Sequence, residues 1–376
     1  MKTQTTEAST DRTESQMVEL SIIVPTFNER YNVREVVERL DACLRGVSWE
    51  VVFVDDDSPD GTAERLREIA RHDRRVRCLQ RIGRRGLSSA CTEGMMASSA
   101  PYLAVMDADC QHDEAALPRM LELLKAGDAD VVVGSRYVDG GGVGDWNGNR
   151  AKMSRFATWL SRLVIKQDLS DPMSGFFALR GDVLNPAVRR LSNLGFKILL
   201  DLVASSPQPL RLKEVPYEFR NRHAGESKLD SQAMWDYLML LLDKLVGHIV
   251  PVRFVAFGLI GAVGVFLHFG VLTTLFRVMG MSFTFSQGSA TIVAMISNFT
   301  LNNALTYRDM RLKGWRWAKG LASFVLLCGV GAIANVGIAS YLFIRNEMWV
   351  LAALAGIVIG AVWNYAMTAM YTWNKR

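Results

Sequence analysis

The stretch LSIIVPTFNERYNVREVVERLDACLRGVSWEVVFVDDD, residues 20–57, decides the fold of the first half of the chain. An apolar run over 20–27 predicts a strand, residues 32–44 carry apolar side chains at helical spacing, and 49–54 predicts a second strand. A strand, an amphipathic helix and a strand in succession indicate a parallel pair joined by a crossover helix. Both predicted strands lead directly into polar segments that contain carboxylates.

The same alternation continues along the chain to about residue 134. It predicts helices over 60–72, 87–97 and 115–125, and strands over 76–79, 102–106 and 130–134. We therefore expect an α/β, Rossmann-like domain over 18–230, with a mostly parallel sheet and helices on both faces. Ligands of such sheets bind at the carboxyl ends of the strands.

The composition changes after Arg253. Four apolar segments follow one another near residues 254–276, 285–305, 321–343 and 350–373. Each has about 20 residues or more, enough to cross a bilayer core about 30 Å thick. We expect an all-α transmembrane domain of four helices over 251–376; buried helices of a soluble domain are the alternative.

Charge predicts the orientation of this domain. The loop between the second and third segments and the end of the chain are basic, through Arg308, Arg311, Lys313, Arg316, Lys319, Lys375 and Arg376. Because positive charge marks the cytoplasmic side, the first domain is predicted to be cytoplasmic in a multi-pass membrane protein. Residues 1–17 are polar and are predicted to form a disordered tail rather than a signal peptide. The net charge of +5 is too small and dispersed to indicate nucleic-acid binding.

Two stretches are predicted to lie at the membrane surface. A helix over about 154–166 places Phe156, Trp159, Leu160, Leu163 and Val164 on one face, with basic residues elsewhere. Residues 231–250 show a similar bias and lead into the first apolar segment. Packing on the core of the first domain is the alternative for both.

Three groups of acidic residues follow predicted strands. They are Glu29, the run Asp55-Asp56-Asp57, and the pair Asp107 and Asp109. Grouped carboxylates repel one another unless a cation or a donor faces them. An Asp-x-Asp at a strand end offers the hard oxygen ligands that Mg²⁺ or Mn²⁺ prefers, with substrate phosphates completing the shell. One such group alone is typical of solvated turns, whereas three at successive strand ends favour a metal and nucleotide site. None of the five histidines stands at metal-ligand spacing, and none is assigned chemistry.

Eight motifs occur in a characteristic order: SIIVPTFNER (21–30), VVFVDDDSPDGT (51–62), GLSSA (86–90), VMDADCQH (105–112), GSRY (134–137), SDPMSGFFALR (170–180), GFKILLDL (195–202) and RHAGESKL (222–229). Together they resemble family 2 glycosyltransferases of the GT-A fold, and within that family the polyprenol-phosphate (dolichol-phosphate) mannose synthases. The apolar segments resemble the GtrA-like membrane domain, chiefly through SNFTLNNALTY (297–307) and WNYAMTAMYTW (363–373).

The resemblance implies a role for each matching residue. The nucleotide-sugar would be bound by Pro25, Phe27, Glu29, Asp55, Asp57, Asp107, Ala108, Asp109, Arg136, Arg222 and Lys228. The metal would be held by Asp107, Asp109 and Gln111, and the lipid phosphate by Arg150, Ser154 and Lys228, with Ser227 nearby. The catalytic set would be Asp109, Arg150, Arg222 and Lys228, and Asp171 and Asp201 would lie in the sugar and active-site region.

The resemblance also implies the reaction, an inverting transfer of mannose from GDP-mannose to the phosphate of a polyprenol at the cytoplasmic face of a prokaryotic cell membrane. A phosphate monoester is mostly dianionic near pH 7, because its second pKa is about 6. Such an acceptor needs charge compensation from arginine, lysine and a metal rather than a strong base. Polyprenyl-phosphate glucosyl transfer from UDP-glucose stays open, as does a lipid-flipping membrane protein with a nucleotide-binding domain.

Overall fold

The computed structural model describes residues 17–142, 148–192, 195–220, 231–344 and 349–373. The chain forms two compact units, Met1–Leu245 and Val246–Arg376. The boundary lies close to the predicted start of the transmembrane domain at residue 251. Each unit is described by itself.

Seven strands form one sheet in the first unit, in the order β3-β2-β1-β4-β6-β5-β7. The strands are β1 (Leu20–Thr26), β2 (Trp49–Asp55), β3 (Val76–Gln80), β4 (Tyr102–Val105), β5 (Val131–Ser135), β6 (Phe177–Arg180) and β7 (Leu212–Pro216). The first four run parallel, β6 is antiparallel to both of its neighbours, and β7 is parallel to β5. The predicted α/β fold with a mostly parallel sheet is confirmed.

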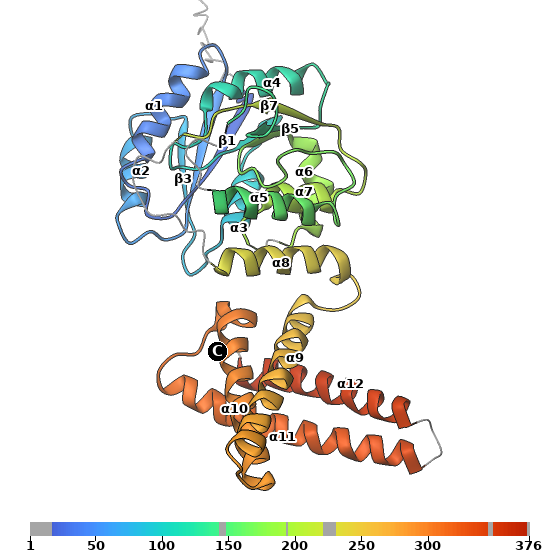
Figure 1. The fold of residues 1–376 in the computed structure, drawn as a ribbon. Helices are drawn as coiled ribbons and strands as arrows, with labels where there is room; N and C mark the ends of the chain where they lie inside the picture. The colour runs from blue at the N-terminus through green and yellow to red at the C-terminus, as the bar shows by residue number, and fades with distance from the viewer. Residues whose placement is uncertain (1–16, 143–147, 193–194, 221–230, 345–348, 374–376) are drawn as a thin grey trace, which may run out of the picture. The chain divides into compact units, whose positions relative to one another are not determined.

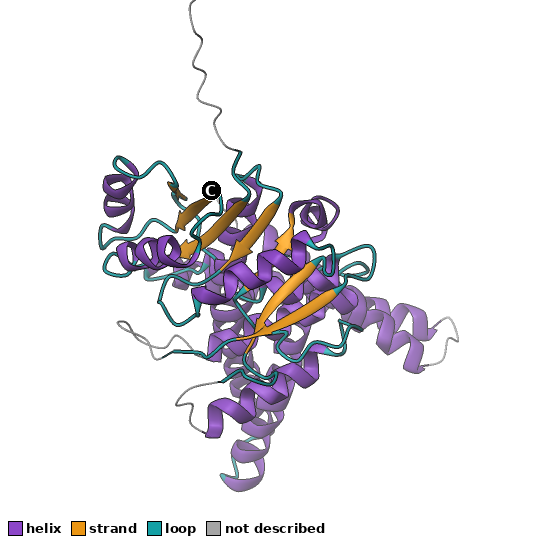
Figure 2. Cartoon of the chain, turned by 90° about the horizontal axis from the view of Figure 1, so that it is seen from above, coloured by secondary structure: helices purple, strands orange, loops and turns teal. Residues whose placement is uncertain are grey.

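Helices cover both faces of this sheet (Figures 1 and 2). One face packs against α1 (Val33–Cys43), α2 (Thr62–Ala70) and α4 (Leu117–Lys125). The other packs against α3 (Leu87–Met96), α5 (Gly148–Ser161), α6 (Gly181–Ala187), α7 (Ile198–Ser205) and α8 (Ser231–Val246). Two short 3-10 helices, η1 (Glu114–Ala116) and η2 (Val188–Arg190), precede α4 and follow α6.

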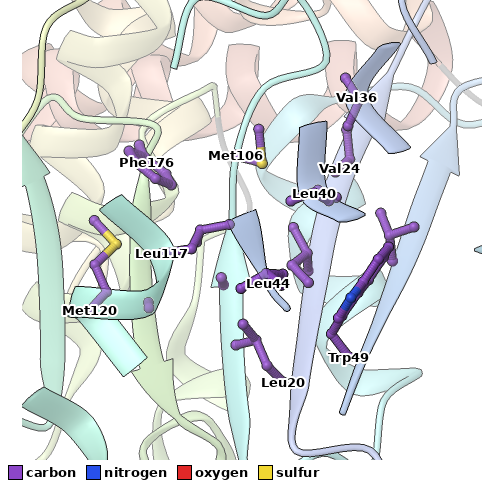
Figure 3. Close-up of a cluster of buried hydrophobic side chains, with 14 of the residues drawn as sticks. Leu20, Val24, Val36, Leu40, Leu44, Trp49, Met106, Leu117, Met120 and Phe176 are labelled. Carbon is purple, nitrogen blue, oxygen red and sulfur yellow. The ribbon is translucent and has the colours of Figure 1, made fainter. Parts of the chain in front are cut away.

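The core explains why the central strands are mostly apolar. Along β1, Ile22 and Val24 belong to the cluster under α1 and α4, whereas Ile23 belongs to the cluster under α3. Figure 3 shows Leu40 of α1 and Leu117 of α4 in the first of these clusters. A strand buried on both faces is apolar at nearly every position, and the buried Ser21 of β1 is satisfied because its hydroxyl donates to Glu50 of β2 at 2.9 Å. Each fully buried leucine or isoleucine contributes about 1.5–3 kcal/mol relative to exposure.

The described residues of the second unit form four long helices, α9 (Val252–Thr273), α10 (Phe283–Leu301), α11 (Trp315–Ile344) and α12 (Trp349–Met367). Three π-helices, η3 (Thr274–Val278), η4 (Asn302–Thr306) and η6 (Thr368–Thr372), follow α9, α10 and α12, and a 3-10 helix, η5 (Arg308–Met310), lies between η4 and α11. The four helices coincide with the four predicted apolar segments. By length and composition, two stretches of the described residues could cross a membrane, Val252–Val278 and Trp315–Ile333.

Two similar helix pairs make up this unit, because α9 packs with α10 and α11 packs with α12. In each pair an asparagine of the second helix lies against a glycine of the first, leaving no room for a Cβ; the contacts are Asn298 with Gly264 and Asn364 with Gly331. A π-helix then ends each pair, followed by Tyr307 and Trp373, whose rings stack 4.1 Å apart. Asn303 bonds beyond its own helix, since its Oδ1 accepts the Trp373 indole N–H at 3.1 Å.

Candidate active site

The loops after β1, β2, β3 and β4 meet at one edge of the sheet, because these four strands are parallel neighbours. The three predicted acidic groups lie in the loops after β1, β2 and β4, so they share this edge. An open cleft of about 740 Å³ lies beside the first two loops, lined by Arg30, Tyr31, Arg34, Ser58, Pro59, Gly61, Glu64, Arg65 and Glu68. None of the predicted site residues that the structure describes lines that cleft.

The three carboxylates after β2 have three different environments. Asp55 is fully buried and accepts hydrogen bonds from the Ser58 hydroxyl at 2.6 Å and the Thr26 hydroxyl at 3.2 Å. Asp56 pairs with the buried Arg81 at 2.8 Å and accepts the Gly86 N–H at 2.7 Å. Burial raises the pKa of the Asp56 carboxyl, and the Gly86 N–H and the Arg81 guanidinium oppose that rise.

Asp57 is the exposed carboxylate of the three. Its backbone has a positive φ of 56°, a strained conformation for a residue with a side chain, and its carboxylate accepts a hydrogen bond from the Gln80 amide at 2.8 Å. The two buried neighbours therefore hold loops together, whereas Asp57 is open to a ligand at the strand ends.

The loop after β1 is tied to the loop after β2. The N–H of Asn28 donates to the Ser58 hydroxyl at 3.0 Å, and the N–H of Glu29 donates to the Thr62 hydroxyl at 3.1 Å. Glu29 accepts a bond from the Asn32 amide at 2.7 Å. Phe27 is partly exposed, with the Arg85 guanidinium 4.4 Å from the centre of its ring. An accessible aromatic ring beside an arginine is suited to stacking on a planar base.

The turn after β4 carries the predicted metal ligands. The side chain of Asp107 is 37% exposed, whereas Asp109 is buried and accepts the Gln111 N–H at 3.2 Å. Cys110 between them has a positive φ of 59°. The Gln111 side-chain amide donates to the Arg220 carbonyl at 3.0 Å, so its Oε1 is the atom suited to a cation. Among the residues that the structure describes, no group of three or more histidine, cysteine, aspartate or glutamate side chains could hold a metal ion by itself.

His112 lies directly beneath this turn, although the sequence assigned it no chemistry. Its Nδ1 accepts the Asp107 N–H at 3.1 Å, and its Nε2 lies 3.7 Å from Asp107 Oδ2. The ring is 2% exposed and stacks on Phe176 with 5.2 Å between centroids. Burial lowers the pKa of His112 to about 4, so the imidazole is neutral near pH 7. The sequence feature that could have identified His112 as part of the site is its position directly after Asp107-Ala108-Asp109-Cys110-Gln111.

Arg136 and Asp171 form a buried ion pair. The guanidinium donates through Nε and Nη2 to the two Asp171 oxygens at 2.7 Å each, and Arg136 also donates its backbone N–H at 3.2 Å. The two side chains are 9% and 0% exposed. The resemblance implied that Arg136 lines the donor site and that Asp171 lies in the sugar region. In the structure these two side chains are bound to each other.

Asp201, for which the resemblance also implied a place in the active-site region, is fully buried elsewhere. It pairs with Lys244 of α8 at 2.6 Å and accepts the Ser192 hydroxyl at 2.8 Å. These bonds tie α7 to α8.

Three of the remaining predicted residues lie beyond what the structure describes. Ser154 of α5 is hydrogen-bonded to the Tyr137 hydroxyl at 2.7 Å, which places α5 beside the end of β5. Arg150 belongs to the first turns of α5, but its side chain is not among those described. Arg222, Ser227 and Lys228 lie outside the described residues.

Comparison with known proteins extends over both units. Residues 21–185 match the family described as glycosyl transferase family 2, and residues 256–373 match the GtrA/DPMS transmembrane domain. Over 360 residues the chain is 34% identical to the dolichol-phosphate mannosyltransferase of Pyrococcus furiosus, covering 95% of this chain and 99% of that protein. The chain belongs to the dolichol-phosphate mannosyltransferase family. The predicted family and glycosyltransferase activity are confirmed.

Two fungal relatives match a smaller share of this glycosyltransferase. The dolichol-phosphate mannosyltransferase of Saccharomyces cerevisiae is 38% identical over 239 residues, covering 61% of this chain and 88% of that protein. That of Mycosarcoma maydis is 37% identical over 235 residues, covering 59% and 78%. The transmembrane-domain match and the two apolar stretches make this glycosyltransferase a membrane protein.

The two predicted surface helices of the glycosyltransferase unit differ from each other. On α5 and the turn after it, Phe156, Trp159 and Leu163 are 52%, 59% and 57% exposed, whereas Leu160 and Val164 pack on the core. The predicted single apolar face is therefore two faces, and α5 ends at Ser161 rather than near 166. On α8, Tyr237, Leu240 and Leu241 are buried in the core. Packing on the core, the alternative stated for α8, holds for this face.

Proposed function

We propose that this glycosyltransferase moves mannose from GDP-mannose to the phosphate of a polyprenol, at the cytoplasmic face of a membrane. One observation carries the proposal. The exposed Asp107 carboxylate lies at the same sheet edge as Phe27 and Asp57, in a chain whose similarity to a dolichol-phosphate mannosyltransferase runs through the catalytic and membrane parts alike.

The donor would lie along this edge, with its base near Phe27 and its diphosphate near the turn after β4. The oxygen atoms of Asp107, Asp109 and Gln111 fit a hard divalent cation, and these residues would hold Mg²⁺ or Mn²⁺. When bound, the cation stabilises negative charge on the departing diphosphate. Neutral His112 beneath the turn adds no positive charge that would repel the cation.

The reaction needs no strong base in this proposal. The acceptor phosphate oxygen attacks the anomeric carbon, the bond from that carbon to the diphosphate oxygen breaks, and GDP departs. A single displacement inverts the anomeric configuration. Because the acceptor is already mostly dianionic, the protein's task is to compensate charge and to align the two substrates. Arg150, Arg222 and Lys228 are the residues proposed to do so at the lipid phosphate.

The membrane arrangement is part of the proposal. Four spanning helices would anchor the enzyme. The basic loop that contains Arg308 and Arg311 would face the cytoplasm. The exposed Phe156, Trp159 and Leu163 would bring the catalytic unit to the interface where a lipid phosphate lies.

An assay with purified full-length protein tests the metal turn. GDP-mannose carrying labelled mannose is incubated with Mg²⁺ or Mn²⁺ and polyprenyl phosphate, and label in the organic phase is counted. Asp109→Ala is expected to lower transfer at least about 100-fold, since preorganised electrostatic groups are typically worth that much. Asp182→Ala, which alters an exposed carboxylate in the first turn of α6, is the control. Unchanged transfer by Asp109→Ala would refute the metal assignment.

The second candidate is the use of UDP-glucose, because no described contact discriminates guanine from uracil. A strong preference for UDP-glucose in the same assay would replace the proposed donor and leave the glycosyltransferase assignment intact.

A further inference from the structure

The imidazole of His112 is fixed in one orientation and one tautomer. Its Nδ1 accepts the Asp107 N–H, so its only proton is on Nε2. Phe176 stacks on the ring with planes 12° apart, and the edges of Tyr217 and Phe219 lie 5.7 Å and 6.0 Å away, centre to centre. An imidazole held on its face and its edge by aromatic rings has no room to rotate.

The Asp107 carboxylate lies beside the same ring. Its Oδ2 is 3.7 Å from His112 Nε2, longer than a hydrogen bond, so the bond that ties Asp107 to the imidazole is the one from its main-chain N–H to Nδ1.

Asp107 is confined from a second side by the segment before β6. A Cβ on Gly175 would lie 3.3 Å from Asp107 Oδ2 and 3.6 Å from His112 Cε1, so a side chain there would push the carboxylate by a few tenths of an ångström. The turn itself is strained at Cys110 and needs external support. His112 and Gly175 both help to define where Asp107 lies.

We propose that His112 is a positioning residue for the divalent-cation site: it fixes the Asp107 main chain, and through it the place of the Asp107 carboxylate, without touching metal or substrate. This inference rests on the proposed function, in which Asp107 contacts the cation. Residues that hydrogen-bond to a metal ligand commonly hold that ligand in place, and the buried His112 would do so for Asp107.

Two substitutions test the hydrogen-bond acceptor and the aromatic ring of His112 separately. His112→Asn keeps an oxygen close to the position of Nδ1, which can accept the Asp107 N–H, but loses the stack. His112→Phe keeps a ring on Phe176 and leaves the Asp107 N–H without its acceptor. Binding of Mn²⁺ to the full-length protein in the presence of GDP is measured by calorimetry, together with the KM for Mn²⁺ and for polyprenyl phosphate in the transfer assay.

His112→Phe is expected to weaken Mn²⁺ binding about 10- to 100-fold, as loss of a ligand's supporting partner typically does. The KM for polyprenyl phosphate should stay unchanged, and His112→Asn should recover Mn²⁺ affinity to within about threefold of wild type by the same reasoning. Wild-type Mn²⁺ affinity in His112→Phe, or equal losses in both variants, would overturn the proposal. If His112→Phe does not fold, Gly175→Ala crowds Asp107 from the other side and must weaken Mn²⁺ binding for the proposal to stand.

Asp107→Asn separates failure of this inference from failure of the proposed function. If Asp107→Asn binds Mn²⁺ as wild type does, the cation site is misplaced and both proposals fall. If it loses Mn²⁺ while His112→Phe and Gly175→Ala do not, only the positioning role of His112 is wrong.

Discussion

At the residue scale, the carboxylates of this edge differ through their neighbours. Asp56 lies between two other aspartates, yet it is the one paired with a buried arginine, and Arg81 also bonds the Ser89 hydroxyl at 2.9 Å and Glu93 at 3.3 Å. This pair holds the loop after β3, which carries Arg85 over Phe27, against the loop after β2. Asp56 therefore shapes the sheet edge at which the donor is proposed to bind, although its own carboxylate is buried.

Arg81→Met should destabilise the protein by about 3–5 kcal/mol near pH 7, because it leaves the Asp56 carboxylate buried without a cation. A buried acid with a raised pKa favours folding below its ordinary pKa, and that contribution is lost as pH rises through the folded value. The deficit of the variant should therefore shrink as pH falls from 7 toward 4. Thermal unfolding followed by tryptophan fluorescence measures both effects.

Arg84→Met is the matched control, since Arg84 pairs with the same Glu93 at 2.9 Å but is 63% exposed. Its effect should stay within about 1 kcal/mol. An Arg81→Met deficit of that small size, or one that grows toward acid pH, would contradict this account of the pair.

The sequence predicted that the three acidic groups follow strands of one sheet, which the structure shows, but not what each carboxylate does. Asp107 and Asp109 could be recognised because an Asp-x-Asp directly follows an apolar strand. The division of labour among Asp55, Asp56 and Asp57 depends on Ser58, on Arg81 and on Gln80. Gln80 is the last residue of β3 and Arg81 follows it, and no local pattern encodes a contact between one strand end and the next.

At the element scale, α5 carries exposed apolar side chains that do not pack on the core of its own unit. Phe156 and Trp159 are exposed and stack on each other with 5.8 Å between centroids. The helix position was predictable from spacing alone, whereas its inward and outward faces were not, because Leu160 and Val164 pack on the core beneath it. Strand β6 was also missed, since four residues in SDPMSGFFALR are too few for a periodic pattern.

Changing Phe156 and Trp159 together to aspartate should lower transfer to polyprenyl phosphate in vesicles by about tenfold or more, because each buried apolar ring contributes kcal/mol-scale membrane affinity. GDP binding, measured by calorimetry, should not change, since both side chains are already exposed. Met96→Asp on α3, at 62% exposure, is the control and should leave transfer unaltered. Equal transfer by wild type and the double variant would show that α5 does not bring the enzyme to lipid.

At the scale of the whole molecule, the division into a sheet domain and a helical domain follows from composition, because charged residues give way to apolar segments after Arg253. The sequence did not predict that α9 pairs with α10 and α11 with α12, because hydrophobicity does not identify which helices pack together. The glycine and asparagine contacts that close each pair are visible only in three dimensions.

Orientation can be tested with single introduced cysteines. Met281→Cys lies between η3 and α10, and Lys313→Cys lies between η5 and α11, in the basic loop. In intact cells an impermeant maleimide should label the first, and it should label the second only after permeabilisation. The unmodified protein sets the background from the native cysteines. The opposite pattern would place the catalytic unit outside the cytoplasm.

The central claim is that one sheet edge serves a nucleotide-mannose and a lipid phosphate together. Its most direct test is the transfer reaction of the purified full-length protein, with GDP-mannose and UDP-glucose compared as donors and polyprenyl phosphate and unphosphorylated polyprenol as acceptors. We expect a mannosylated lipid only from GDP-mannose with polyprenyl phosphate and a divalent cation. Label on unphosphorylated polyprenol, or none on polyprenyl phosphate with either donor, would contradict it.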